Sequence, residues 1–318
     1  MSDSVYLDPL NQAVADQLAT EPPIADLTVP EFRAFFERVQ QHEPIPGVTR
    51  TNFTVPFEDG VEAFVFKADG AATNELPVIF YLHGGGWKGG NVNIYDSICR
   101  ELALQTGYAV VFPEYTLAPE ARYPTQQEQC YATVKYVSEH GHEHGLSREK
   151  FAIVGDSAGG QLAVATTLLA STRNDGIKFG VQVLLHPITD TVTSDRDTPS
   201  AFHFFNGPFN TVPFMRGAID TYIPIATDRE SELASPQKIS AEHAAKQPPT
   251  LIISSAVDVL RDDGLLFGEI LQKAGVDCAV VVAHGQLHVS LVLEATRKGP
   301  TPRAMMRLVA TKIKETLS

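Results

Sequence analysis

Two segments near the N-terminus repeat apolar residues at helical spacing. In residues 7–18 and 31–40 the apolar positions recur every three or four residues, which places them on one face of an α-helix. The first face carries Leu7, Leu10, Val14 and Leu18, and the second carries Phe32, Phe35, Phe36 and Val39. The pattern therefore predicts two amphipathic helices ahead of the first strand.

From about residue 48 the periodicity becomes that of β-strands. Residues 48–55 and 61–66 are rich in β-branched and aromatic residues, and the turn formers between them predict a hairpin. Six later runs are continuously apolar, which is typical of strands buried on both faces of a parallel sheet. They span residues 76–83, 108–113, 151–155, 181–186, 250–255 and 278–283. Helix-like stretches lie between most of them, near residues 93–105, 124–139, 158–172 and 263–274. This alternation predicts an α/β fold with a mostly parallel central sheet flanked by helices.

One interval, residues 190–247, is too long for a simple connection between two strands. It is rich in aromatic residues, namely Phe202, Phe204, Phe205, Phe209, Phe214 and Tyr222. Together with the N-terminal helices it is expected to form a helical cap over the carboxyl edge of the sheet. The expected division is N-terminal cap helices at 1–47, the first part of the core at 48–190, a cap insertion at 191–246 and the second part of the core at 247–318.

The segment FAIVGDSAGG, residues 151–160, carries the strongest catalytic signal. It places a Gly-x-Ser-x-Gly motif directly after a predicted strand and directly before a predicted helix, which is the context of a nucleophile elbow. Small residues on both sides of Ser157 allow a strained turn that lifts the hydroxyl toward the helix N-terminus. No Gly-Lys-Ser/Thr follows, so a phosphate-binding loop is excluded. We interpret Ser157 as a nucleophile.

A serine hydroxyl needs a base to take its proton, and the base needs an acid to fix its tautomer. Asp258 comes three residues after the strand at 250–255, whereas Asp262 lies where a helix would begin. Past the last strand, His284 is close to the strand end, and His288 sits in the following loop before an apolar helical stretch. We expect Asp258 and His288 to complete the triad. His186 has no clustered partner in the sequence and receives no role.

The oxyanion of a tetrahedral intermediate requires preorganised backbone donors. Three glycines after the strand at 76–83 are expected to supply them together with the N–H that follows the nucleophile. These donors are Gly84, Gly85, Gly86 and Ala158. His83 is expected to orient this loop. The residues expected to contact substrate are Trp87, Asp156, Phe205, Phe209 and Phe214.

Composition narrows the classes of partner. The 318 residues carry a formal net charge of −13, so no basic stripe is present to neutralise nucleic-acid phosphates. No run approaches the length of a membrane span, and we expect no membrane insertion. Three widely spaced cysteines fit free thiols in a reducing cytoplasm, which is the expected location. We expect no cofactor and no metal, and a homodimer stays open.

The motifs together resemble those of the hormone-sensitive-lipase-like esterases, particularly the bacterial and fungal carboxylesterases. The similar motifs, in family order, are HGGGW at 83–87, EYTLAPE at 114–120, GDSAGG at 155–160 and DVLRDDG at 258–264. The resemblance spans most of the chain and implies an α/β-hydrolase fold, the triad of Ser157, Asp258 and His288, and a helical cap. One departure is Val289-Ser290, which stands where the family usually has Gly-Phe after the histidine.

The expected activity is hydrolysis of small-molecule carboxylic esters with short to medium acyl chains, through an acyl-enzyme. An amidase or formamidase with the same triad is the main alternative, and matched esters and amides would separate the two. A non-catalytic small-molecule receptor is the other alternative. Receptors of this fold typically lack a triad residue, whereas all three are present here.

Overall fold

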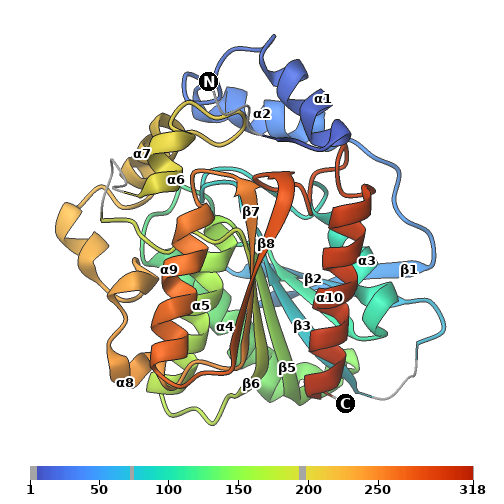
Figure 1. Ribbon diagram of the computed structural model, residues 1–318. Helices are drawn as coiled ribbons and strands as arrows, with labels where there is room; N and C mark the ends of the chain where they lie inside the picture. The colour runs from blue at the N-terminus through green and yellow to red at the C-terminus, as the bar shows by residue number, and fades with distance from the viewer. Residues whose placement is uncertain (1–5, 72–74, 193–197, 318) are drawn as a thin grey trace.

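The computed structural model describes residues 6–71, 75–192 and 198–317, and its centre is one eight-stranded sheet (Figure 1). The strand order is β1-β2-β4-β3-β5-β6-β7-β8. β1 pairs with β2 and β2 with β4 antiparallel, and every later neighbour is parallel. The strands are β1 (Val48–Val55), β2 (Val61–Ala68), β3 (Leu76–Leu82), β4 (Ala109–Pro113), β5 (Leu146–Asp156), β6 (Phe179–Leu185), β7 (Thr250–Val257) and β8 (Cys278–Leu287). The predicted hairpin and the mostly parallel sheet are confirmed.

Helices cover both faces of the sheet. α3 (Asp96–Thr106) and α10 (Pro300–Leu317) lie on one face, and α4 (Thr125–His140), α5 (Ala158–Thr172) and α9 (Arg261–Lys273) lie on the other (Figure 1). The four helix stretches expected from the pattern correspond to α3, α4, α5 and α9, with ends that differ by a few residues. β3 to β6 are buried almost throughout because helices cover them on both sides, which explains their unbroken apolar runs.

A third layer lies across the carboxyl ends of the strands. It holds α1 (Pro9–Leu18), α2 (Val29–Val39), α6 (Pro199–His203) and α7 (Val212–Tyr222) (Figure 1). α2 begins at a capping box in which Thr28 and Glu31 bond reciprocally, and it buries Phe32, Phe35 and Phe36 toward the core. The two predicted N-terminal helices are therefore present. The remaining short elements are η1 (Gly141–His144), η2 (Ala226–Glu230), η3 (Pro236–Lys238) and α8 (Ala241–Ala244).

The stretch after His288 differs from the expectation. Residues 288–297 form a series of tight turns rather than a helix, and α10 begins only at Pro300. A proline suits the first position of a helix because its missing N–H has no intrahelical acceptor there. Among the described residues, no helix combines the length and apolar character needed to cross a bilayer.

Candidate active site

Ser157 occupies the turn between β5 and α5. Its φ of 54° and ψ of −117° are strained for a residue that carries a Cβ. Glycines make this turn possible, because a Cβ on Gly155 would overlap the carbonyl of Gly159 and a Cβ on Gly159 would overlap that of Leu82. The strain lifts the hydroxyl out of the sheet at the N-terminus of α5, where the helix dipole is positive.

His288 and Asp258 lie beside this serine. The Ser157 hydroxyl is 2.9 Å from Nε2 of His288, and Nδ1 of the same ring is 2.6 Å from Oδ2 of Asp258. The carboxylate accepts a hydrogen bond from Nδ1–H, which leaves the unprotonated Nε2 free to take the proton of the hydroxyl. Asp258 is fixed in turn, since its Oδ1 accepts the N–H of Leu260 at 3.0 Å. All three side chains are buried.

The competing residues point elsewhere. His284 is exposed on β8, and its ring stacks on Tyr6 with 5.0 Å between centroids. Asp262 accepts hydrogen bonds from the N–H of Ser200 at 2.8 Å and from Nε of Arg261 at 2.9 Å. The structure therefore brings His288 and Asp258 together with Ser157. Neither His284 nor Asp262 lies beside the serine.

The glycine loop after β3 turns toward the serine. Gly85 and Gly86 have φ of 101° and 62°, values that favour glycine, and both line the cavity above Ser157. Within the described part of the chain, the N–H groups of Gly85, Gly86 and Ala158 have no acceptor. Gly84 differs from the expectation, because its N–H donates to Oδ1 of Asp156 at 3.0 Å and is occupied. Three backbone donors remain available near the nucleophile.

A small apolar cavity of ≈ 30 Å³ covers the serine. Its lining residues are Ile24, Phe32, Phe35, Phe36, Gly85, Gly86, Ser157, Phe209, Asn210, Phe214, His288 and Val289. Half of these residues come from α2, from α7 and from the loop before α7. Since the volume holds only about one or two waters, a long acyl chain does not fit without displacement of a side chain.

Three of the expected substrate contacts do not line this cavity. Trp87 is fully buried away from the cavity, where its indole N–H donates to Gln161 at 3.1 Å and its ring stacks on Tyr222. Phe205 is 40% exposed and does not line the cavity. Asp156 is buried beneath the loop. Phe209 and Phe214, in contrast, do line the cavity.

Residues 79–292 match the model of a family described as having the alpha/beta hydrolase fold. The chain belongs to this family. The resemblance to hormone-sensitive-lipase-like esterases and the expected fold are thereby confirmed.

The chain of this hydrolase is similar over nearly its full length to esterases. It is 37% identical over 315 residues to an esterase of Gibberella moniliformis, covering 98% of each chain. A thermostable esterase from Pseudomonas putida has 30% identity and a TM-score of 0.94, covering 100% of this chain and 99% of the other. Carboxyl esterase 2 of Tuber melanosporum has 33% identity and a TM-score of 0.89, covering 98% and 100%. The hydrolase is a carboxylesterase, as expected.

Asp156 holds the glycine loop of the hydrolase. Besides the N–H of Gly84, its carboxylate accepts the hydroxyls of Tyr81 at 2.9 Å and Tyr95 at 3.2 Å. Complete burial raises the pKa of Asp156 to about 6, although these donors act in the opposite direction. His83 supports the same loop, because its Nδ1–H donates to the carbonyl of Gly84 at 2.7 Å. Burial lowers the pKa of His83 to about 4, so its ring is neutral.

His186 was missed by the sequence reasoning. It is fully buried directly after β6, and its ring lies edge-on to the ring of His288 with 4.7 Å between centroids. Neither ring nitrogen has a hydrogen-bond partner in the described residues, and burial holds the pKa of His186 well below its ordinary value. A neutral imidazole therefore packs against the side of the candidate base. The only signal in the sequence is its position at the end of a buried strand.

Proposed function

We propose that the hydrolase cleaves short-chain carboxylic esters through Ser157, His288 and Asp258. The observation that carries the proposal is the 2.9 Å approach of His288 Nε2 to the serine hydroxyl, with Asp258 on the other ring nitrogen. In the first half-reaction Ser157 attacks the ester carbonyl while His288 takes the proton of the serine hydroxyl. The resulting imidazolium is stabilised by Asp258 and then protonates the leaving alcohol. Water repeats the sequence on the acyl-enzyme and releases the acid.

The oxyanion of each tetrahedral intermediate is bound, in this proposal, by the N–H groups of Gly85, Gly86 and Ala158. Asp156 does not touch substrate but holds Gly84, and through it the loop, in place. We further propose that residues 1–47 and 191–246 act as the cap, with 48–190 and 247–318 as the catalytic core. The small cavity supports acyl groups at the short end of the expected range.

The cysteines support a cytoplasmic site of action for the proposed enzyme. Cys99 and Cys130 are buried and Cys278 is partly buried, and all three are free thiols. Burial raises the pKa of the Cys130 thiol, which makes the thiol unreactive. Proteins that work in oxidising compartments more often pair their cysteines.

The test is a set of paired variants assayed on p-nitrophenyl acetate and butyrate. Ser157→Ala and His288→Ala should each lower kcat by about 10³-fold or more, because the nucleophile and its base act as one unit. His284→Ala is the matched control for the histidine and should retain wild-type turnover, since it faces solvent.

The acid is tested in the same way, with Asp258→Asn against Asp262→Asn. Only the first should lower kcat strongly. Covalent labelling by a fluorophosphonate should occur in the wild type and be lost in Ser157→Ala. Turnover by Ser157→Ala within tenfold of wild type would refute the proposed nucleophile.

A further inference from the structure

The N-terminal helix α1 reaches the backbone on both sides of His288. Asn11 is fully buried, and its Oδ1 accepts the backbone N–H of Leu287 at 3.0 Å and the hydroxyl of Ser290. Its amide nitrogen donates to Gln286 at 3.1 Å and to Asp8 at 2.9 Å. The side chain of Asn11 therefore binds Leu287, directly before the proposed base, and Ser290, two positions after it.

Asp8, the N-cap residue of α1, strengthens this attachment. Its carboxylate accepts Nε2 of Gln286 at 2.6 Å, and its N–H donates to the carbonyl of Gly285 at 3.0 Å. These bonds join the beginning of α1 to the end of β8, which is the strand that delivers His288. The helix is thus bonded to the strand and to the turn that follows it.

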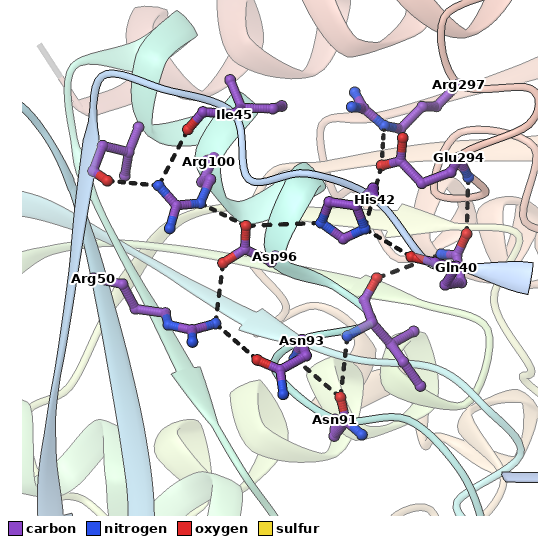
Figure 2. A network of polar contacts seen from close by, with 12 residues as sticks. Gln40, His42, Ile45, Arg50, Asn91, Asn93, Asp96, Arg100, Glu294 and Arg297 are labelled. Carbon is purple, nitrogen blue, oxygen red and sulfur yellow. Dashed lines mark hydrogen bonds and ion pairs between the residues drawn. The ribbon is translucent and has the colours of Figure 1, made fainter. Parts of the chain in front are cut away.

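A second contact secures the far end of the same turn. Oε1 of Gln40, just after α2, accepts the backbone N–H of Glu294 at 2.8 Å, and its amide donates to the carbonyl of Val292 at 3.4 Å. Figure 2 shows Gln40 beside Glu294, with His42 donating to the Gln40 carbonyl at 2.7 Å. The segment 287–294 is therefore held at two places by the N-terminal segment.

The turn needs such support because it is strained. Val289, directly after the base, has φ of 57°, a left-handed conformation that is rare for a β-branched residue. Strain of this kind costs about 1–3 kcal/mol and persists only where the surroundings hold it. Val289 stands where the resembled esterases usually have glycine, which adopts this conformation without strain. Ser290, whose hydroxyl meets Asn11, is the other departure from that pattern.

We propose that Asn11 is a positioning residue for His288. It acts through the Leu287 N–H and the Ser290 hydroxyl, and it keeps the Val289 turn in the conformation that directs the imidazole at Ser157. The proposal rests on the assignment of His288 as the base. It gives the N-terminal segment a role in the chemistry that is separate from its role as the roof of the cavity.

The test compares Asn11→Ala with Val14→Ala, a buried position of the same helix that makes no polar contact with the turn. Misplacing a catalytic group by about 1 Å costs up to about 100-fold in rate. Asn11→Ala should therefore lower kcat by about 10- to 100-fold with KM nearly unchanged, because Asn11 does not line the cavity. Val14→Ala should lower the melting temperature but keep kcat within about twofold.

A rescue variant separates positioning from a loss of packing. Asp8→Asn combined with Asn11→Asp exchanges the two side chains, keeps an acceptor for Leu287 and Ser290, and leaves the net charge unchanged. It should recover most of the lost kcat. Ser290→Ala removes only one contact and should give a smaller loss in kcat, also with KM unchanged, which keeps the test valid if Asn11→Ala folds poorly.

Two outcomes would overturn the positioning role. One is a kcat for Asn11→Ala equal to that of Val14→Ala, and the other is an exchange variant as slow as Asn11→Ala. Failure of the proposed function is distinguishable, since it would appear as turnover in Ser157→Ala. Loss of turnover in Ser157→Ala with wild-type kcat in Asn11→Ala would remove the positioning role alone.

Discussion

Phe209 separates the small active-site cavity from a larger cavity next to it. The active-site cavity measures ≈ 30 Å³, whereas its neighbour between α1 and α2 measures ≈ 210 Å³. Phe35 and Phe209 line both. Phe209 lies in the loop before α7 and is only partly buried. Of the two shared wall residues, it is therefore the one whose ring can be removed with the smaller loss of stability. Phe209→Ala should join the two cavities.

The size of the effect follows from the area that an acyl chain buries. Each buried methylene contributes about 0.8 kcal/mol, which is about fourfold in kcat/KM. In the wild type this gain ends after one or two methylenes, because the cavity is then full. In Phe209→Ala the four methylenes that separate octanoate from butyrate enter the joined cavity, which sets an upper bound of about 200-fold. Freezing the chain's rotamers reduces this gain, so we expect about 10- to 50-fold.

The assay is a series of p-nitrophenyl esters from C2 to C10, scored as the ratio of kcat/KM for C8 to that for C4. Phe205→Ala is the matched control, since Phe205 lies in the same loop, is exposed and does not line the cavity. Its ratio should equal that of the wild type. An unchanged ratio in Phe209→Ala, or a shift in Phe205→Ala instead, would refute the assignment of Phe209 as the wall.

Two further predictions concern the buried carboxylate and the N-terminal segment. Because the pKa of Asp156 is raised from 3.8 to about 6, this group's contribution to stability is full below about pH 3.8 and is lost as the pH rises through about 6. As the pH rises from 4 to 7, the unfolding free energy of Asp156→Asn should increase by up to about 3 kcal/mol relative to that of the wild type. Urea denaturation measures this difference, and parallel pH profiles of the two proteins would contradict the prediction. Deleting residues 1–45 should abolish turnover even of p-nitrophenyl acetate, because roof and positioning contacts are lost together. Wild-type turnover of the deletion variant would contradict both roles.

The mostly parallel sheet and the proposed reacting residues follow from local patterns. Unbroken apolar runs are required of strands covered on both faces, so the parallel part of the sheet can be predicted from the sequence. Ser157 can be predicted because the elbow needs small residues at fixed offsets. His288 and Asp258 follow the ends of β8 and β7, and parallel strands bring such positions to one edge of a sheet.

The structure differs from the expectation where the sequence does not specify which way a side chain or an N–H group points. Three consecutive glycines look equivalent, and only the position of Asp156 beneath the loop distinguishes Gly84 from its neighbours. Trp87 and Phe205 have the size and apolar character of cavity-lining residues, yet one faces the core and the other solvent. The polar contacts of Asn11 join residues about 275 positions apart, and no local pattern encodes such a pairing.

The two parts of the proposed cap are held in different ways, and we therefore expect them to affect catalysis differently. The N-terminal segment is bonded through the buried side chains of Asn11 and Gln40 to the turn that carries His288, so displacing it displaces the base. The loop before α7 contributes Phe209, which contacts the turn through apolar packing, with 6.4 Å between its ring centroid and that of His288. Substitutions in residues 1–47 that break the polar contacts should therefore act on kcat at every chain length. Substitutions in the loop before α7 should instead change which chain length is preferred.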